Sequence, residues 1–296
     1  MAAWGSSRGN KLGYQIFTYF LKYSGLSPTY FLLRIVTIYY IFFPGKAGRH
    51  IRYFYNQRLG FSSMKSLRYM YENFNYLGKS IIDKLAIMSG SASKYEVEHL
   101  GQKNIEQLIQ QGQGGLLVSA HLGNWEGAGH LLQFYNTKIN IVMYDGEQEK
   151  IKEFLEQVKN KSFNVIFIRD TMSHIYEINE AIQRNELICI HADRYVEGNK
   201  TIKGTLLGKE ADFPIGPFVL ATSFQVPVSF VFAMKKSKHV FSFYASKSKI
   251  YPKGREGINT MLQDYLQAIE QKIHSYPLQW HNYFSFWDEE KKQSDR

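Results

Sequence analysis

The sequence predicts an α/β fold, a largely parallel sheet covered by helices on both faces, preceded by a basic and aromatic N-terminal helical region. From residue 114 onward, short apolar runs alternate with segments of helical pattern, as in parallel strands joined by helical crossovers. His121, Arg169 and Asp193 each follow directly after one of these runs. Ligands bind beyond the carboxyl ends of parallel strands, so these three residues mark one candidate edge. We divide the chain into a helical region over 1–60 and an α/β domain over 61–296.

The elements before the sheet are mainly helical. An apolar run over 30–43 ends at Pro44 and Gly45. Apolar and aromatic residues at helical spacing predict a long amphipathic helix over 62–88, which we expect to pack on the α/β body. A strand over 95–99 follows, and then a helix that ends at Gly112.

The rest of the sequence alternates between strand patterns and helix patterns, and an aromatic tail follows them. The predicted strands are 114–120, 139–144, 164–168 and 186–192, and the predicted helices are 125–135, 147–161 and 172–184. Beyond them we expect a hairpin over 201–213, a helix opened by the prolines at 214 and 217, strands over 226–234 and 240–246, and a helix over 256–275. The aromatic tail over 277–287 is expected to dock back on the body.

Composition limits the class of protein. A hydrophobic share of 44% with 21% charged residues excludes general disorder. Cys189 is the only cysteine, so no internal disulfide forms and a reducing compartment is compatible. Cys189 lies in an apolar run, where we expect a buried small residue and no nucleophile.

Basic and aromatic residues are concentrated in the first 80 residues. This segment holds 11 Lys or Arg and one acid, Glu72, and so carries the whole net charge of +10. It also holds 20 of the 46 aromatic residues. Basic, aromatic-rich surfaces bind either single-stranded nucleic acid or anionic membranes. Here the aromatics are interleaved with Leu, Ile and Val, which favours a membrane surface and no nucleic acid.

The run over 30–43 is the candidate membrane anchor. It is 14 residues long and contains Arg34, whereas a simple span needs about 20 residues. It is therefore either a short or tilted span or a helix lying in the interface, and both remain open. No secretory cleavage site follows the run, and basic residues flank it on both sides. These flanks predict a body on the cytoplasmic side.

His121 and Glu126 form the candidate acid/base pair. Asn124 can cap a helix that starts after the strand, and the break at Gly123 lets both side chains face one pocket. We also expect free backbone N–H groups at this turn, where an anion would be favoured. The alternative is a structural histidine at a strand end. The spacing lacks the His-Glu-x-x-His pattern and a cysteine cluster, so we predict no metal.

Three motifs resemble those of a known family. They are HLGNWE at 121–126, HADRY at 191–195 and GTLLGKEADFPIGPFVLA at 204–221. The basic N-terminal region and Gln279-Trp280 also fit. On these residues the sequence resembles the late acyltransferases of bacterial lipid A biosynthesis, of the lauroyl or myristoyl type, within the lysophospholipid acyltransferase group.

The resemblance implies an enzyme on the cytoplasmic face of the bacterial inner membrane, attached peripherally or by a single anchor. It would move a fatty acyl chain from a thioester, usually acyl carrier protein or else acyl-CoA, to a hydroxyl of a membrane lipid, without a further cofactor. His121 would be the general base and Glu126 would orient it. Asp193 and Arg194 match a family block and serve either structure or chemistry. Arg169 would stabilise negative charge or form a surface ion pair, and Asn124 is a weaker substrate-binding candidate.

The sequence alone leaves the acceptor lipid and the protein partner open. The same motifs suit a lipid A precursor and another glycolipid or aminolipid, such as a phosphatidylinositol mannoside. Lys200, Lys203 and Lys209 are either contacts for an acidic carrier protein or a solvated face. A non-enzymatic basic module that binds a membrane surface or nucleic acid is the third hypothesis.

Overall fold

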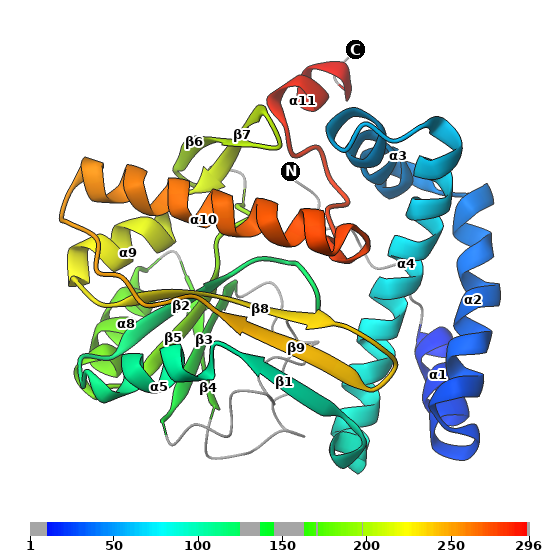
Figure 1. Cartoon of the computed structure of the whole chain (residues 1–296), viewed down its shortest axis with the longest axis horizontal. Helices are drawn as coiled ribbons and strands as arrows, with labels where there is room; N and C mark the ends of the chain where they lie inside the picture. Colours follow the sequence, from blue (N-terminus) through cyan, green and yellow to red (C-terminus); the bar gives the residue numbers. More distant parts are fainter. Residues whose placement is uncertain (1–10, 125–136, 145–162, 170, 197, 295–296) are drawn as a thin grey trace.

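The N-terminal region of the computed structural model is helical. The structure describes residues 11–124, 137–144, 163–169, 171–196 and 198–294. Its first elements are α1 (Lys11–Ser24), α2 (Leu26–Phe42), α3 (Gly45–Tyr53), the π-helical turn η1 (Phe54–Arg58) and α4 (Ser63–Ala86) (Figure 1). The Ser62 side chain caps α4 by accepting a hydrogen bond from the Lys65 backbone N–H. The predicted helix over 62–88 is confirmed.

A seven-stranded sheet forms the body. Its strands lie in the order β1 (Glu96–Leu100), β9 (Val240–Ala245), β8 (Val228–Lys235), β2 (Gly115–Ser119), β5 (Leu187–His191), β3 (Ile139–Tyr144) and β4 (Phe163–Ile168). All neighbouring strands are parallel except β8 and β9. The prediction of a largely parallel sheet is confirmed. In Figure 1, β8 points toward α4, so the carboxyl ends of β8 and of its parallel partner β2 face the N-terminal helices.

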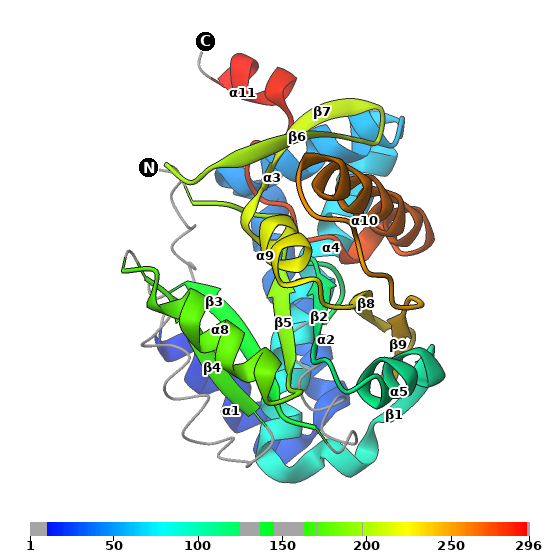
Figure 2. The same ribbon diagram turned by 90° about the vertical axis from the view of Figure 1, so that its left-hand side faces the viewer.

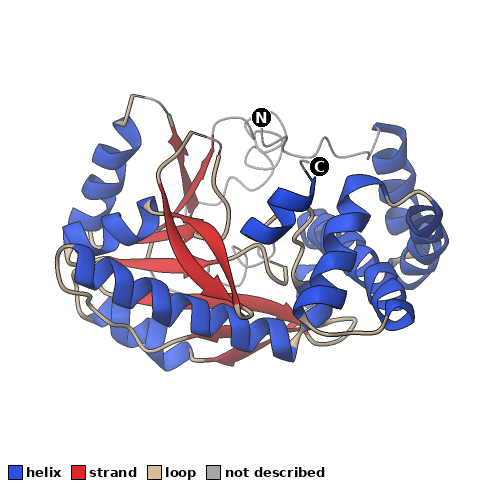
Figure 3. Cartoon of the chain, turned by 90° about the horizontal axis from the view of Figure 1, so that it is seen from above, coloured by secondary structure: helices blue, strands red, loops and turns tan. Residues whose placement is uncertain are grey.

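Helices cover both faces of this sheet because successive strand residues point to opposite sides. Leu116 and Val118 pack with α8 (Ser173–Gln183), α9 (Gly216–Phe224) and α10 (Arg255–Ser275). Leu117 packs on the other face with α5 (Gln102–Gln110). Figures 2 and 3 show helices on both sides of the strands. The helices predicted over 125–135 and 147–161 lie outside the described residues.

The hairpin and the aromatic tail are as predicted. β6 (Thr201–Leu206) pairs antiparallel with β7 (Lys209–Pro214), and α11 (Asp288–Ser294) follows the tail. Trp280 and Trp287 are 1% and 0% exposed, and Trp287 donates from its indole Nε1 to the Leu206 carbonyl at 3.0 Å. The tail therefore fills the space between the sheet and the N-terminal helices.

A buried ion pair ties these helices to the sheet. Lys235 of β8 lies 2.7 Å from the Asp83 carboxylate of α4, and the two side chains are 4% and 0% exposed. Tyr30 of α2 and Tyr95, next to β1, both donate to the other Asp83 oxygen. One carboxylate thus joins two helices to two strands.

The outer surface of α1 and α2 is rich in exposed apolar side chains. They include Tyr19, Tyr23, Phe31, Ile35, Tyr39, Phe42 and Phe43. Among the described residues, no helix on its own has the length and hydropathy of a membrane span. By these two criteria only α2 and Gly45–Arg58 qualify, taken together and with an 87° bend at the break between them. The anchor and the division at residue 60 remain predictions.

Candidate active site

Strand order brings His121 next to Asp193. β2 and β5 are adjacent, with Ser119 opposite His191, and the Ala192 N–H donates to the Ser119 carbonyl at 3.0 Å. His121 and Asp193 each lie two residues after this last pair, and their side chains are in contact there. Both were predicted at the carboxyl edge, and the structure confirms that place for both.

Asp193 holds His121 at two points. One carboxylate oxygen accepts from the His121 backbone N–H at 2.9 Å, and the other lies 2.8 Å from Nδ1 of the ring. The His121 and Asp193 side chains are 12% and 3% exposed. Burial alone would raise the pKa of Asp193, but the charge and hydrogen bond of His121, with the charge of Arg194, bring that pKa well below its usual range. An ionised Asp193 accepts a hydrogen bond from the Nδ1–H group, which leaves Nε2 as the basic nitrogen.

Two further histidines surround this pair. The rings of His191 and His121 have centroids 4.6 Å apart, and the backbone N–H of His281 donates to the His121 carbonyl at 3.2 Å. Burial, with the charge of His121, lowers the pKa of His191 to about 3. Burial and the charge of Arg194 do the same for His281, so both rings are neutral at pH 7. Sequence reasoning missed them, although His191 opens the HADRY block and ends a predicted strand.

The backbone after β2 tests part of one prediction, because the first residues of the helix predicted over 125–135 lie outside the described residues. We expected free N–H groups at this turn, but those of His121 to Asn124 all donate within the chain. His121 donates to Asp193, Leu122 to the Ala120 carbonyl, Gly123 to the Gln279 carbonyl at 2.7 Å and Asn124 to the Ala233 carbonyl at 2.8 Å. These four N–H groups are therefore not a binding site for a developing anion, because other acceptors already occupy them.

The C-terminal tail completes the turn. Leu122 and Trp280 form a β-bridge, and Gln279 bonds the backbone of Lys235 through both ends of its amide, at 2.9 and 2.8 Å. Arg194 donates from Nη2 to the His281 carbonyl at 2.6 Å and lies over the Phe284 ring. Arg194 thus positions the tail. Asn124, which follows Gly123 in the turn, is 2% exposed.

Arg169 stands apart from this pair. Arg169 follows β4, three strand spacings or about 14 Å from β2. Its side chain is 44% exposed and lies 4.0 Å from Glu177. Arg169 therefore lies at the predicted carboxyl edge of the sheet, but β5 and β3 separate its strand from β2. Glu126 lies outside the described residues, and its role stays a prediction.

His121, His191 and Asp193 also form a group that could hold a metal ion, since one ligand atom of each lies within 4.8 Å of the others. The 2.8 Å between Nδ1 and Oδ1 is a hydrogen-bond distance. Two ligands of a tetrahedral zinc would stand about 3.3 Å apart, given bonds of about 2.0 Å. As placed here, these two atoms fit a shared proton better than a shared ion.

The hairpin lysines have partners in the chain itself. Lys203 lies 3.0 Å from the Asp212 carboxylate and also pairs with Asp288, and Lys209 pairs with Glu289. This favours the solvated-face interpretation for both.

One comparison with known proteins matches the part of the chain that contains the three motifs. The family model described as bacterial lipid A biosynthesis acyltransferase matches residues 65–287. This match includes all three motifs, the His121–Asp193 pair and the tail that closes the turn. A comparison with curated proteins found no match. The non-enzymatic hypothesis is therefore wrong: the chain is an enzyme that transfers acyl groups, and it belongs to the bacterial lipid A biosynthesis acyltransferase family.

Proposed function

We propose that the protein transfers a fatty acyl chain from a thioester of acyl carrier protein to a hydroxyl of a lipid A precursor, with His121 as general base. The observation that carries the proposal is the His121–Asp193 pair at the carboxyl edge of the sheet. It fixes both the ring orientation and the tautomer that a base needs.

The reaction follows from this geometry. Nε2 of His121 takes the proton of the acceptor hydroxyl while the oxygen attacks the thioester carbonyl carbon and forms the new C–O bond. Collapse of the tetrahedral intermediate breaks the C–S bond. The imidazolium then returns its proton to the departing thiolate, so the products are the ester and the free thiol. Asp193 stabilises the imidazolium between these steps without taking its proton.

The surroundings of the pair suit transfer over hydrolysis. Both side chains are largely buried, and exclusion of water limits the competing attack on the thioester. His191 adds a neutral ring against His121, so it brings no opposing positive charge. Glu126, for which the sequence suggested the orienting role, is proposed as a contact for the acceptor, since Asp193 already takes Nδ1.

The test is acyl transfer from acyl carrier protein to lipid in membranes. His121→Ala should lower kcat by roughly 10²–10⁴-fold, the usual contribution of a general base. Asp193→Asn should cause a comparable loss, because an amide that donates to Nδ1 selects the wrong tautomer. Asp264→Asn, the same change in a carboxylate that pairs with Lys249 at 2.7 Å, is the matched control and should retain activity. Full activity of His121→Ala would overturn the proposal.

The acceptor is separately testable by mass spectrometry of lipids from a deletion strain. Underacylated lipid A supports the proposed acceptor. Normal lipid A with loss of an acyl group from another glycolipid or an aminolipid supports the alternative acceptor. Transfer from acyl-CoA at the same rate as from acyl carrier protein would contradict the proposed donor.

We propose that the enzyme works at the cytoplasmic face of the inner membrane, held by the outer surface of α1 and α2. Exposed apolar side chains concentrated on two neighbouring helices are typical of interaction sites, and Tyr side chains suit the membrane interface. Phe42→Ser with Phe43→Ser should release the protein from membranes in a sedimentation assay. Unchanged sedimentation would place the attachment elsewhere.

A further inference from the structure

An open pocket lies where α3, η1 and the first turn of α4 meet. Its volume is about 390 Å³, within the range of small-molecule sites. Its lining consists of Arg49, Arg52, Tyr53, Asn56, Gln57, Ser63 and Ser66. Two arginines, two side-chain amides, two serines and one tyrosine thus line one space, and no carboxylate lines it.

The two arginines are an unneutralised pair. They are three residues apart on α3 and therefore neighbours on one face, where like charges repel. The adjacent cations are engaged, because His50 lies 2.7 Å from Glu290 and Arg58 lies 3.6 Å from Glu289. Among the described residues Arg49 and Arg52 form no ion pair. An anion held between them would remove the repulsion.

The opposite wall is fixed by its own hydrogen bonds. Asn56 and Ser66 both donate to the Phe61 carbonyl, at 2.8 and 3.3 Å, and Gln57 donates to the Asn56 amide oxygen at 2.6 Å. The first turn of α4 contains no acidic residue, so its positive end adds to the field of the arginines. Guanidinium forks and hydroxyls together match the several oxygens of a phosphate group.

Exposed apolar side chains lie near the pocket-lining residues along the chain. Phe42 and Phe43, at the end of α2, are 73% and 60% exposed, and Met64, next to Ser63, is 77% exposed. Free phosphate has no apolar surface to bury against these side chains, whereas a phospholipid carries apolar chains close to its phosphate.

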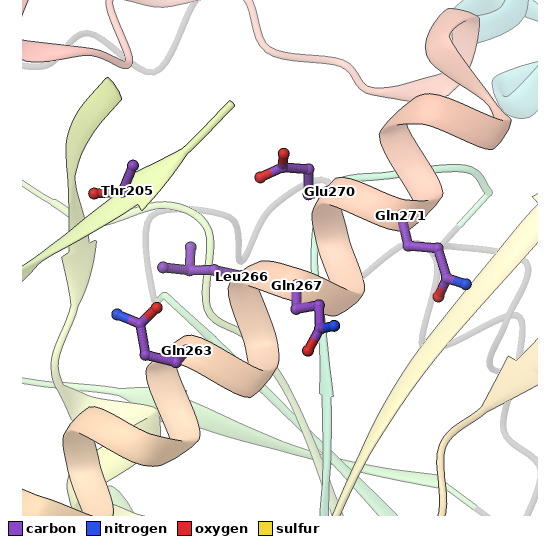
Figure 4. A pocket seen from close by; sticks show the side chains of 6 residues that line it. All are labelled: Thr205, Gln263, Leu266, Gln267, Glu270 and Gln271. Atoms are coloured by element: carbon purple, nitrogen blue, oxygen red, sulfur yellow. The ribbon is translucent and has the colours of Figure 1, made fainter. Parts of the chain in front are cut away.

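A second pocket offers a contrast. It lies between β6 and α10 and is lined by Thr205, Gln263, Leu266, Gln267, Glu270 and Gln271 (Figure 4). It carries no cation, and one oxygen of its only carboxylate, that of Glu270, accepts from the Leu207 N–H at 3.2 Å. The first pocket therefore differs from the second in having two cationic side chains that could bind an anion.

We propose that the pocket between α3 and α4 binds the phosphate group of a membrane glycerophospholipid, whose acyl chains lie against Phe42, Phe43 and Met64. The pocket is not lined by His121 or Asp193, so binding of the lipid there does not depend on acyl transfer. Such a lipid would fix the depth and orientation of the protein on the bilayer, beyond what non-specific attraction of basic residues gives.

The test measures binding of monomeric dihexanoyl phosphatidic acid to the full-length protein by calorimetry, at constant ionic strength. Saturable one-site binding is expected. Arg49→Gln with Arg52→Gln should weaken it at least about tenfold, as expected for the loss of charged hydrogen bonds. Ser63→Trp, which fills the pocket and leaves the charge unchanged, should weaken it similarly. Lys22→Gln with Arg34→Gln removes the same charge from α1 and α2 and should leave the affinity within about twofold, because neither residue lines the pocket. Thermal unfolding confirms that each variant is folded.

Other outcomes would overturn the proposal. Absence of saturable binding, full affinity in Ser63→Trp, or equal losses in the two double variants would each do so. Inorganic phosphate is the second probe, and equal affinity for it would mean that the pocket recognises free phosphate. His121→Ala should bind the lipid like the unaltered protein, so failure of the proposed catalytic role and failure of this site remain distinguishable.

Discussion

His121 depends on Asp193 for both its backbone and its ring. The buried Asp193 carboxylate accepts a hydrogen bond from the His121 backbone N–H and also contacts Nδ1 of the His121 ring. The path of the backbone after β2 therefore sets the orientation of the ring. Buried polar groups of this kind are costly when a partner is lost. Asp193 therefore couples the local fold to the chemistry.

The neutral histidines beside this pair predict how stability depends on pH. Burial, with the charge of Arg194, lowers the pKa of His281 to about 3, below its unfolded value of 6.5. Between these values the unfolded chain binds the proton and the folded chain does not, so stability falls as pH falls from 6.5 toward 3. His281→Gln should reduce the slope of unfolding free energy against pH, measured by urea denaturation between pH 6 and 4, by about 1.4 kcal/mol per pH unit. An unchanged slope would mean that His281 is charged in the folded protein.

At the scale of elements, the turn after β2 depends on a glycine. Gly123 has a φ of +76°, and a Cβ there would lie 2.1 Å from the Ala233 carbonyl oxygen. That close approach permits the adjacent hydrogen bond from the Asn124 N–H to the same oxygen. The motif at 121–126 therefore needs glycine for backbone reasons, independent of any contact with substrate.

Gly123→Ala should destabilise the protein by at least about 2 kcal/mol and lower kcat, because both the φ angle and the contact with Ala233 oppose a side chain. Gly208→Ala separates the two causes, since Gly208 has a φ of +77° but open space around it. Its cost should be about 1 kcal/mol, without loss of activity. Equal unfolding free energies for the two variants in chemical denaturation would contradict the steric explanation.

The sequence predicted the described strands because their apolar runs are short and bounded by polar or glycine residues. β2, β3, β4 and β5 begin and end within one or two residues of the predicted ranges. It did not predict the spatial order of the strands, which is set by crossovers that periodicity does not encode. For that reason it grouped Arg169 with Asp193 and did not single out Asp193 as the partner of His121. The pairing of Leu122 with Trp280 is likewise long-range, and no local pattern indicates it.

At the scale of the whole molecule, the Asp83–Lys235 pair holds the helical region on the sheet. Burial raises the pKa of Asp83 and lowers that of Lys235, and each shift is opposed by the charge of the partner. The pair lies among Tyr30, Tyr95 and Phe241, where an unpaired charge would be very unfavourable.

Asp83→Asn should therefore lower the unfolding free energy by about 3–5 kcal/mol, because it leaves the buried Lys235 ammonium without its counterion. Asp83→Leu combined with Lys235→Met should recover much of this loss, since no charge is then buried. Lys236→Gln, which breaks the exposed pair with Glu98, serves as the control and should change stability little. A small effect of Asp83→Asn would show that Lys235 reaches water.

The bridge between Leu122 and Trp280 also bears on synthesis of the enzyme. Gly123 and His121 are bonded to Gln279 and His281, which are synthesised long after the turn itself. A nascent chain that has not yet reached them lacks the contacts that set the backbone around His121. Acyl transfer by the growing polypeptide is thus expected to begin only after translation has passed these residues.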